Sequence, residues 1–117
     1  MYLNKSIVAG TLLENPEQNK EKNVCTFTIK TKKIYRDSNG DKKEPEEYHR
    51  IVVFGKQGSI ISTYKKKGDY ILVEGYMKTR ERDNKGTHEL LTEIVAENIQ
   101  YLPNQTYKVG QEIRKPE

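Results

Sequence analysis

Aromatic and basic residues alternate in the stretch EEYHRIVVFGK, residues 46–56. In a β-strand alternate side chains share a face, so Tyr48, Arg50 and Phe54 point to the same side. The opposite face carries His49, Ile51 and Val53. This face is mainly apolar and is predicted to face the core. Tyr48 and Phe54 lie about 20 Å apart at roughly 3.3 Å per residue, so the two rings can stack on an extended ligand but not on each other.

The same pairing of aromatic residues with cations recurs in DYILVEGYMKTRER, residues 69–82. One face of this predicted strand is apolar and carries Ile71, Val73 and Met77. The other face carries Tyr70, Leu72, Glu74, Tyr76, Lys78, Arg80 and Arg82. A third predicted strand has Cys25, Phe27 and Ile29 on one face, and Thr26, Thr28, Lys30 and Lys32 on the other.

Aromatic rings interleaved with lysine and arginine on one sheet face suit a single-stranded nucleic acid, because bases stack on rings while phosphates meet cations. Stacking contributes roughly 1–3 kcal/mol per base and tolerates any sequence. A duplex hides its base faces and would leave the rings unused. For one strand alone the alternative is structural, since exposed tyrosines pack across strands and cations protect sheet edges. The same pairing on two strands, together with Lys30 and Lys32 on a third, favours binding.

Catalytic chemistry finds little support in the sequence. Cys25 stands in an apolar strand, which favours a small core residue over a nucleophile. His49 alternates with core positions and His88 is isolated, so neither belongs to a metal-ligand motif. The lone cysteine excludes an internal disulfide, and no glycine-rich loop has phosphate-binding spacing. We expect no enzyme activity, no metal and no cofactor.

The composition limits the class of protein. A chain of 117 residues has room for one domain with a modest core. Lysine plus arginine exceed aspartate plus glutamate by 21 to 17, and this net charge of +4 favours an anionic partner without proving one. The first residues lack a secretory signal pattern, and no run approaches the roughly 18 apolar residues of a membrane helix. These features predict a cytoplasmic protein.

Apolar alternation bounded by turn residues predicts strands in five segments: 3–13, 24–35, 46–56, 69–82 and 88–102. Polar connectors separate the first three, and the second connector contains the turn pair Asn39-Gly40. A helix is predicted within residues 56–69, where Ile60, Ile61 and Tyr64 recur at helical spacing and Gly68 ends it. This order predicts an all-β, five-stranded Greek-key OB-fold barrel with one short helix between strands three and four. The domain covers residues 1–102, and residues 103–117 are predicted to form a short flexible tail.

Several segments resemble bacterial and phage single-stranded DNA-binding proteins, over about residues 1–102. The segments that carry this resemblance are SIVAGTLLENPE, NVCTFTIKTKKIYRD, EEYHRIVVFGK, STYKKKGDYILVEGYMKTR and TEIVAENIQYL. The resemblance implies an OB-fold that assembles as a homo-oligomer, usually a tetramer, with a dimer as the alternative. It also implies wrapping of single-stranded DNA, without strong sequence preference, during replication, recombination or repair.

The resemblance assigns roles to individual residues. The family's stacking aromatics match Tyr35, Tyr48 and Phe54, although strict alternation alone would place Tyr35 on the core side. A histidine that helps to hold subunits together matches His49. Basic groove positions match Lys56, Lys67, Lys78 and Arg80, with Arg50 beside them.

Two departures from the family pattern leave alternatives open. Arg82 stands near the position of a stacking aromatic, where a guanidinium can still stack and Tyr76 can add a platform. Residues 103–117 show no acidic, hydrophobic tip of the kind that recruits replication enzymes in relatives. The predicted function is sequence-independent single-stranded DNA binding. The alternatives are a primosome-type adaptor that binds a replication protein and has weaker DNA affinity, and an RNA-binding OB module.

Overall fold

The computed structural model describes residues 1–103. In chain order the elements are β1 (Ser6–Leu12), β2 (Glu17–Asn19), β3 (Val24–Lys32), β4 (Tyr35–Arg36), β5 (Lys42–Lys43), β6 (Glu46–Phe54), α1 (Lys56–Tyr64), β7 (Tyr70–Asn84) and β8 (Thr87–Tyr101). The prediction of a mainly β chain with one short helix is confirmed. Three short strands, β2, β4 and β5, add to the five long ones that the sequence predicts. Within residues 1–103, no helix has the length and apolar character needed to cross a membrane.

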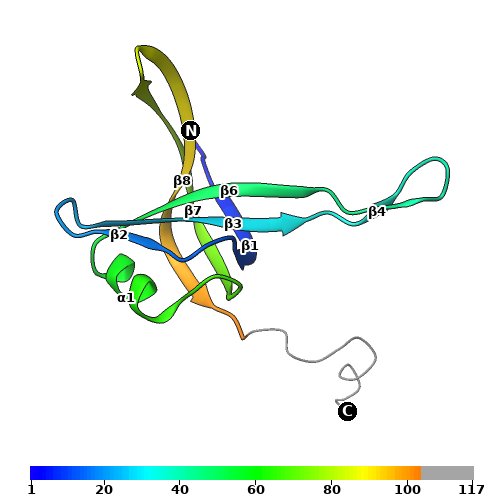
Figure 1. The fold of residues 1–117 in the computed structure, drawn as a ribbon, viewed down its shortest axis with the longest axis horizontal. Coiled ribbons are helices and arrows are strands. Elements are labelled where there is room, and N and C mark those ends of the chain that lie inside the picture. Colours follow the sequence, from blue (N-terminus) through cyan, green and yellow to red (C-terminus); the bar gives the residue numbers. More distant parts are fainter. Residues whose placement is uncertain (104–117) are drawn as a thin grey trace.

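Six strands form one sheet in the order β1-β7-β8-β6-β3-β2, and β1 also pairs with β3. The pairing of β6 with β8 is parallel, whereas the other pairings in this sheet are antiparallel. Because β1 pairs with both β7 and β3, the pairings run from β3 back to β1. The long strands therefore wrap around a common interior, with α1 at one end (Figure 1).

The inward faces of the long strands supply the core. Cys25, Phe27 and Ile29 alternate along β3 and are at most 3% exposed, as their spacing predicts. The inward residues of β6 and β7 are equally buried: Ile51, Val53, Ile71 and Val73. Met77 departs from the prediction, since it is 51% exposed. Met77 is the first of the exposed residues that continue to the end of β7, where the strand forms a projecting hairpin (Figure 1).

A register shift between β7 and β8 decides which residues of β8 face inward. The pairs on either side of the shift are Glu74 with Asn98 and Gly75 with Ala96. Glu97 is therefore an extra residue on β8, and such a bulge reverses the facing of the residues beyond it. Ile94 and Ile99 are an odd number of positions apart and would face opposite sides of a regular strand, yet both belong to the core. The bulge thereby turns Glu93 and Val95 to the outer face.

Helix α1 packs against the sheet through Ile61, which is fully buried, and Gly58. A Cβ atom on Gly58 would lie 2.9 Å from the Cβ of Cys25, so only glycine permits this close approach of helix and strand. Of the three residues predicted at helical spacing, only Ile61 is buried. The helix ends at Tyr64, earlier than predicted, and Gly68 occupies the following turn with φ near +92°.

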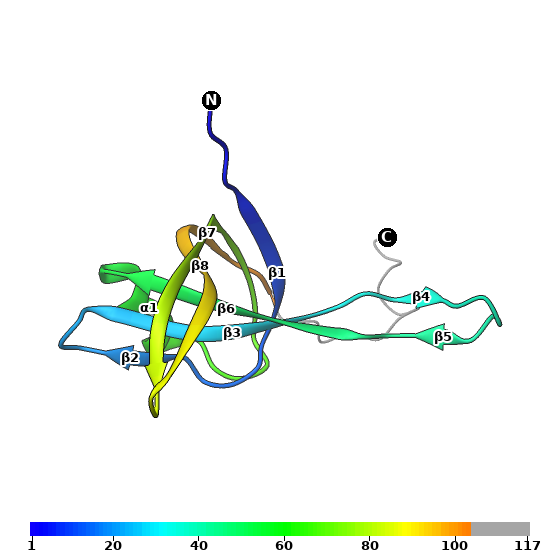
Figure 2. The same cartoon turned by 90° about the horizontal axis from the view of Figure 1, so that it is seen from above.

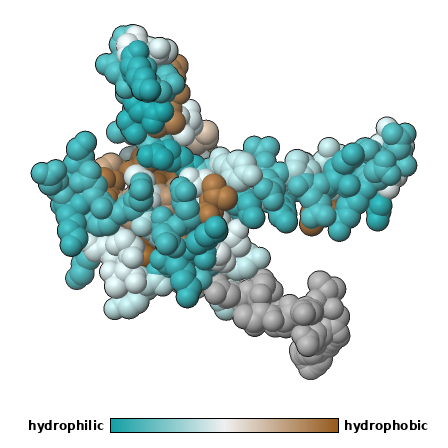
Figure 3. All heavy atoms as spheres, viewed as in Figure 1, coloured by the Kyte–Doolittle hydropathy of each residue, from teal (hydrophilic) through white to brown (hydrophobic). Residues whose placement is uncertain are grey.

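Two hairpins project from the body (Figures 1 and 2). The first, called the arm, comprises residues 33–45, where β4 pairs with β5 in a segment that the sequence predicts as a loop. The second is the β7–β8 hairpin, which turns at Lys85 and Gly86 with φ values of 52° and 85°. Both projections are coloured mainly as hydrophilic, and apolar colour shows on the body between them (Figure 3). Each projection therefore presents mainly polar surface beyond the body.

Candidate nucleic-acid interface

A groove of about 910 Å³ lies on the outer face of the sheet. One side is formed by residues 17–22, from β2 and the turn that follows it. The other lining residues come from β3, β6, β7 and β8: Val24, Thr26, Arg50, Val52, Phe54, Lys78, Arg80, Glu93 and Val95. The groove combines apolar surface with cations, which is the combination that the sequence predicts for this face.

Four predicted binding residues meet in the groove: Arg50, Phe54, Lys78 and Arg80. The alternation of β6 brings Arg50 and Phe54 to this face together with Val52, as predicted. Phe54 is 58% exposed, so much of its ring is open to a ligand. Val52 and Val95 are each 7% exposed and give the groove an apolar base beneath the charged side chains.

Glu93 joins the two arginines of the groove. Arg50 Nε donates a hydrogen bond of 2.7 Å to Glu93 Oε2. Arg80 donates from Nε to Oε1 at 2.9 Å and from Nη2 to Oε2 at 3.2 Å. Glu93 is 4% exposed, so its charge is buried and both of its oxygens accept hydrogen bonds from cations. A buried carboxylate needs such partners, because an unpaired charge away from water is strongly destabilising.

These contacts set the protonation of Glu93. Burial acts to raise the pKa of the carboxyl, but hydrogen bonds and charge attraction from Arg80 and Arg50 outweigh it. The net effect is a pKa below the usual 4.5. Glu93 is therefore ionised at neutral pH.

Acid should remove a stabilising contribution of Glu93. The pKa of Glu93 is lower in the folded chain than in the unfolded chain. The ionised side chain therefore stabilises the fold at pH values above the unfolded pKa, and this stabilisation is lost as pH falls through the folded pKa. Glu93→Gln should lower the urea midpoint at neutral pH and have a progressively smaller effect as pH falls below 4.5. Urea unfolding of both proteins across this range measures the difference. A difference that stays constant would show that the charge of Glu93 does not stabilise the fold.

A second cluster of predicted residues lies further along the outer face of β3 and β6. Tyr48 is 56% exposed, and its hydroxyl donates a 2.7 Å hydrogen bond to Glu46. That hydrogen bond is the main cause that lowers the pKa of Glu46. The ammonium groups of Lys30 and Lys32 lie 3.9 and 4.0 Å from the same carboxylate. Both lysines also line a smaller hollow of about 370 Å³ beside Tyr70.

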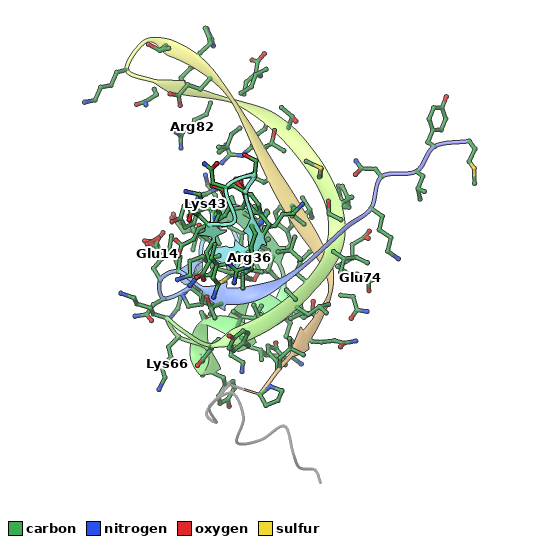
Figure 4. The ribbon with its side chains drawn as sticks, turned by 90° about the vertical axis from the view of Figure 1, so that its right-hand side faces the viewer. Glu14, Arg36, Lys43, Lys66, Glu74 and Arg82 are labelled. Atoms are coloured by element: carbon green, nitrogen blue, oxygen red, sulfur yellow. The ribbon has the colours of Figure 1, made fainter. Side chains whose placement is uncertain are left out.

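The remaining five predicted residues belong neither to the groove lining nor to this second cluster. Tyr35 lies on the arm and is 46% exposed. Strict alternation would place it on the core side, and this placement is wrong because the chain leaves the core before β4 begins. Arg82 projects from the β7–β8 hairpin and donates a 2.9 Å hydrogen bond to Glu89 (Figure 4). Tyr76 is half-buried on β7. Lys56 is exposed at the start of α1, and Lys67 is exposed in the turn after α1. Figure 4 labels Arg36 and Lys43 on the arm, which extends toward the viewer.

His49 lies beside the core, half-buried, opposite Ile29 in the pairing of β6 with β3. Its Nε2 atom is 2.9 Å from the hydroxyl oxygen of Thr31. The side chain is thus held in place within a single chain, while part of it stays accessible.

Comparison with known proteins identifies the family of the chain. Residues 3–102 match the model of the Single-strand binding protein family. The chain belongs to this family. A curated relative, Single-stranded DNA-binding protein 1 of Chlorobaculum tepidum, is 40% identical over 105 residues. That match covers 86% of this chain and 65% of the relative, so the chain spans about two thirds of the relative's length.

Solved structures of the same kind are similar in fold. The Plasmodium falciparum SSB complex with ssDNA is 25% identical, with a TM-score of 0.72, and the match covers 87% of this chain and 96% of that one. A deletion mutant of the single-stranded DNA binding protein from Thermus aquaticus is also 25% identical, with a TM-score of 0.74 and coverage of 86% and 50%. The small single-stranded DNA-binding protein from Streptomyces coelicolor is 16% identical, with a TM-score of 0.65 and coverage of 86% and 95%, and shows the fold alone.

Part of the groove in this member of the single-strand binding protein family is not predicted by the sequence. Glu93 and Val95 reach it because β8 pairs with β6 in parallel, across a long separation in sequence. Lys20 and Lys22 reach it because residues 17–22 fold back beside β3. The one available signal is the run TEIVAEN, whose alternation puts Glu93 and Val95 on one face. That run does not reveal which strand lies beside it.

Cys25 is a core residue. It is fully buried, and burial raises the pKa of its thiol to about 11, so the reactive thiolate is absent at neutral pH. His88 lies on the exposed β7–β8 hairpin, 2.9 Å from Asp83. Within residues 1–103, no cluster of histidine, cysteine and carboxylate side chains could hold a metal ion.

Proposed function

We propose that this chain binds single-stranded DNA without sequence preference, as a non-catalytic protein of replication, recombination or repair. The observation that carries the proposal is the exposed ring of Phe54 in the same groove as Arg50, Lys78 and Arg80. A base can stack on the ring while neighbouring phosphates meet the cations. Membership of the family supports this function, as does the P. falciparum relative, whose structure is a complex with ssDNA.

We further propose that the five long strands form a Greek-key OB-fold barrel, the architecture that many single-strand binders use. The support is the order of pairings, which runs β1-β7-β8-β6-β3 and returns to β1. In this barrel α1 connects the third and fourth long strands, and β2 and the arm are additions. Residues 1–102 would constitute the DNA-binding domain. The predicted tail, apart from Pro103, lies outside the described residues.

The proposed path of the DNA follows the outer face of β6. Phe54 and Tyr48 lie on this face at opposite ends of a row that includes Arg50, so bases stacked on the two rings would place intervening phosphates near the arginine. Beyond Tyr48 the path meets Lys30 and Lys32. Tyr35 on the arm and Arg82 on the β7–β8 hairpin extend the basic, aromatic surface on either side.

The test is a fluorescence-anisotropy titration of labelled oligo-dT at two salt concentrations, with oligo-U and a duplex of equal length as competitors. The proposal predicts salt-sensitive binding to oligo-dT and little competition by the duplex. Preferential binding of oligo-U would instead assign the groove to RNA. Weak binding to every nucleic acid would contradict the proposal and favour a protein-binding adaptor.

Arg80→Ala should flatten the salt dependence of DNA binding. Loss of one phosphate contact on a single strand reduces the slope of log affinity against log salt by about 0.7. Titrations of oligo-dT at four or more salt concentrations measure the slope for wild type and variant. Lys65→Ala, which removes a lysine placed over the ring of Tyr101 and outside the groove lining, is the matched control. An unchanged slope in Arg80→Ala would remove Arg80 from the phosphate contacts.

We also propose that the chain assembles as a homo-oligomer, a tetramer or a dimer, with His49 at a subunit contact. The support is the accessible part of His49 on the inward face of β6, whose next residues along that face, Ile51 and Val53, are buried. His49→Ala should lower the mass measured by sedimentation on dilution. Thr31→Val is the matched control, because it removes the same intrachain hydrogen bond and leaves the imidazole in place. Equal masses for wild type and His49→Ala at every concentration would assign His49 to packing within one chain.

A further inference from the structure

Glu93 is an acidic residue in a groove proposed to hold a polyanion. A carboxylate repels phosphates, so its presence needs a reason other than attraction for DNA. The side chain of Glu93 is 5% exposed, whereas those of Arg50 and Arg80 are 40% and 44% exposed. The acid is therefore buried beneath the two cations and is not a competing charge at the surface.

The position of Glu93 in the sheet explains what it can hold. Strand β8 lies between β6 and β7, so the two arginines come from strands that do not pair with each other. Glu93, on the strand between them, contacts both guanidinium groups at 2.7 to 3.2 Å. The contacts use Nε of Arg50 and two nitrogens of Arg80. A guanidinium carries five N–H donors, so each arginine retains further donors on its exposed part.

We propose that Glu93 is a positioning residue that holds Arg50 and Arg80 as a prearranged pair of phosphate-binding groups. This inference rests on the proposed function. A long side chain that is free in solution loses rotational freedom when it binds, and this loss weakens binding. Because Glu93 fixes both guanidinium groups when the chain folds, the two side chains have lost this rotational freedom before DNA binds. The buried acid also cancels one of the two positive charges.

The test compares Glu93→Gln in two backgrounds, the wild type and the variant Arg50→Ala/Arg80→Ala, by oligo-dT anisotropy. In the wild type, Glu93→Gln should weaken binding about tenfold, because two arginine side chains must then be ordered by the DNA itself. In the background without the arginines, the same substitution should tighten binding. There Glu93 has nothing to position, and its charge can only repel phosphates.

Three outcomes would overturn the inference: tighter binding in both backgrounds, which would make Glu93 a repelling charge; equal weakening in both, which would make its role purely structural; or no change in either. Failure of the wild type to bind oligo-dT would instead overturn the proposed function. Glu74→Gln is the control for charge, because Glu74 pairs with Lys5 at 3.1 Å outside the groove lining. It should bind with about the wild-type affinity.

A second variant keeps the test decisive if Glu93→Gln does not fold, which urea unfolding reports. Glu93→Asp retains the charge, but its side chain is one methylene shorter and cannot reach both arginines in the same geometry. It should weaken binding to oligo-dT with an unchanged salt slope. Wild-type affinity in Glu93→Asp would overturn the positioning role.

Discussion

Phe54→Ala is expected to weaken binding to oligo-dT by roughly 5- to 150-fold, which corresponds to about 1–3 kcal/mol for the loss of one stacked base. Phe54 is the aromatic residue that lines the groove beside Arg50 and Arg80, and 58% of its side chain is exposed. Because Phe54 is more than half exposed and does not belong to the core, its removal should leave the core intact. Anisotropy titration at one fixed salt concentration measures the effect.

Tyr101→Ala is the matched control for Phe54→Ala. Tyr101 is also an exposed aromatic at a strand end, 43% exposed, but it lies outside the groove lining and contacts Lys65. Its removal should leave the affinity for oligo-dT unchanged. Wild-type affinity in Phe54→Ala, with an unchanged urea midpoint, would show that no base stacks on Phe54.

Gly75→Ala is expected to have the largest effect on folding. Gly75 lies at the register shift, and a Cβ atom there would overlap the carbonyl oxygen of Val95 and lie 2.8 Å from its carbonyl carbon. The obstructing atoms are backbone atoms of the neighbouring strand, so β7 and β8 must separate to admit a methyl group. Overpacking of this kind lowers the free energy of unfolding by about 3 kcal/mol. Urea unfolding measures the loss.

Gly40→Ala separates this steric effect from the general effect of replacing glycine. Gly40 has φ near +84° at the end of the arm, and a Cβ atom there would meet nothing within 4 Å. The substitution should lower stability by about 1 kcal/mol, the penalty for a side chain in the left-handed region. If Gly75→Ala were no more destabilising than Gly40→Ala, the close approach of β7 and β8 would not be required for the fold.

The sequence predicts the faces of strands that lie wholly within the core. Cys25, Phe27 and Ile29 alternate with polar residues, and burial of one face fixes their direction. The same reasoning places Arg50 and Phe54 on the outer face of β6. It fails for Met77 because alternation describes only the direction of a side chain, and β7 continues past the end of the core. For Tyr35 it fails because the chain leaves the sheet before β4.

The parts of the site that the sequence does not predict depend on contacts between distant segments. From the sequence alone, Glu93 cannot be told apart from the other acidic residues. Its role depends on the pairing of β8 with β6, which brings its side chain to Arg50. The bulge at Glu97, which sets the facing of Glu93, has no local signal of its own. Glycine at position 75 is visible in the sequence, but the backbone that it accommodates belongs to β8.

We propose that the outer face of β6 binds bases through the rings of Phe54 and Tyr48 as well as phosphates through cations. The most direct test compares oligo-dT with an abasic strand that has the same number of phosphates, in titrations at several salt concentrations. We expect the abasic strand to bind much more weakly but with the same salt slope, because only the stacking is lost. Equal affinity for the two strands would contradict base stacking, since binding would then depend on phosphates alone.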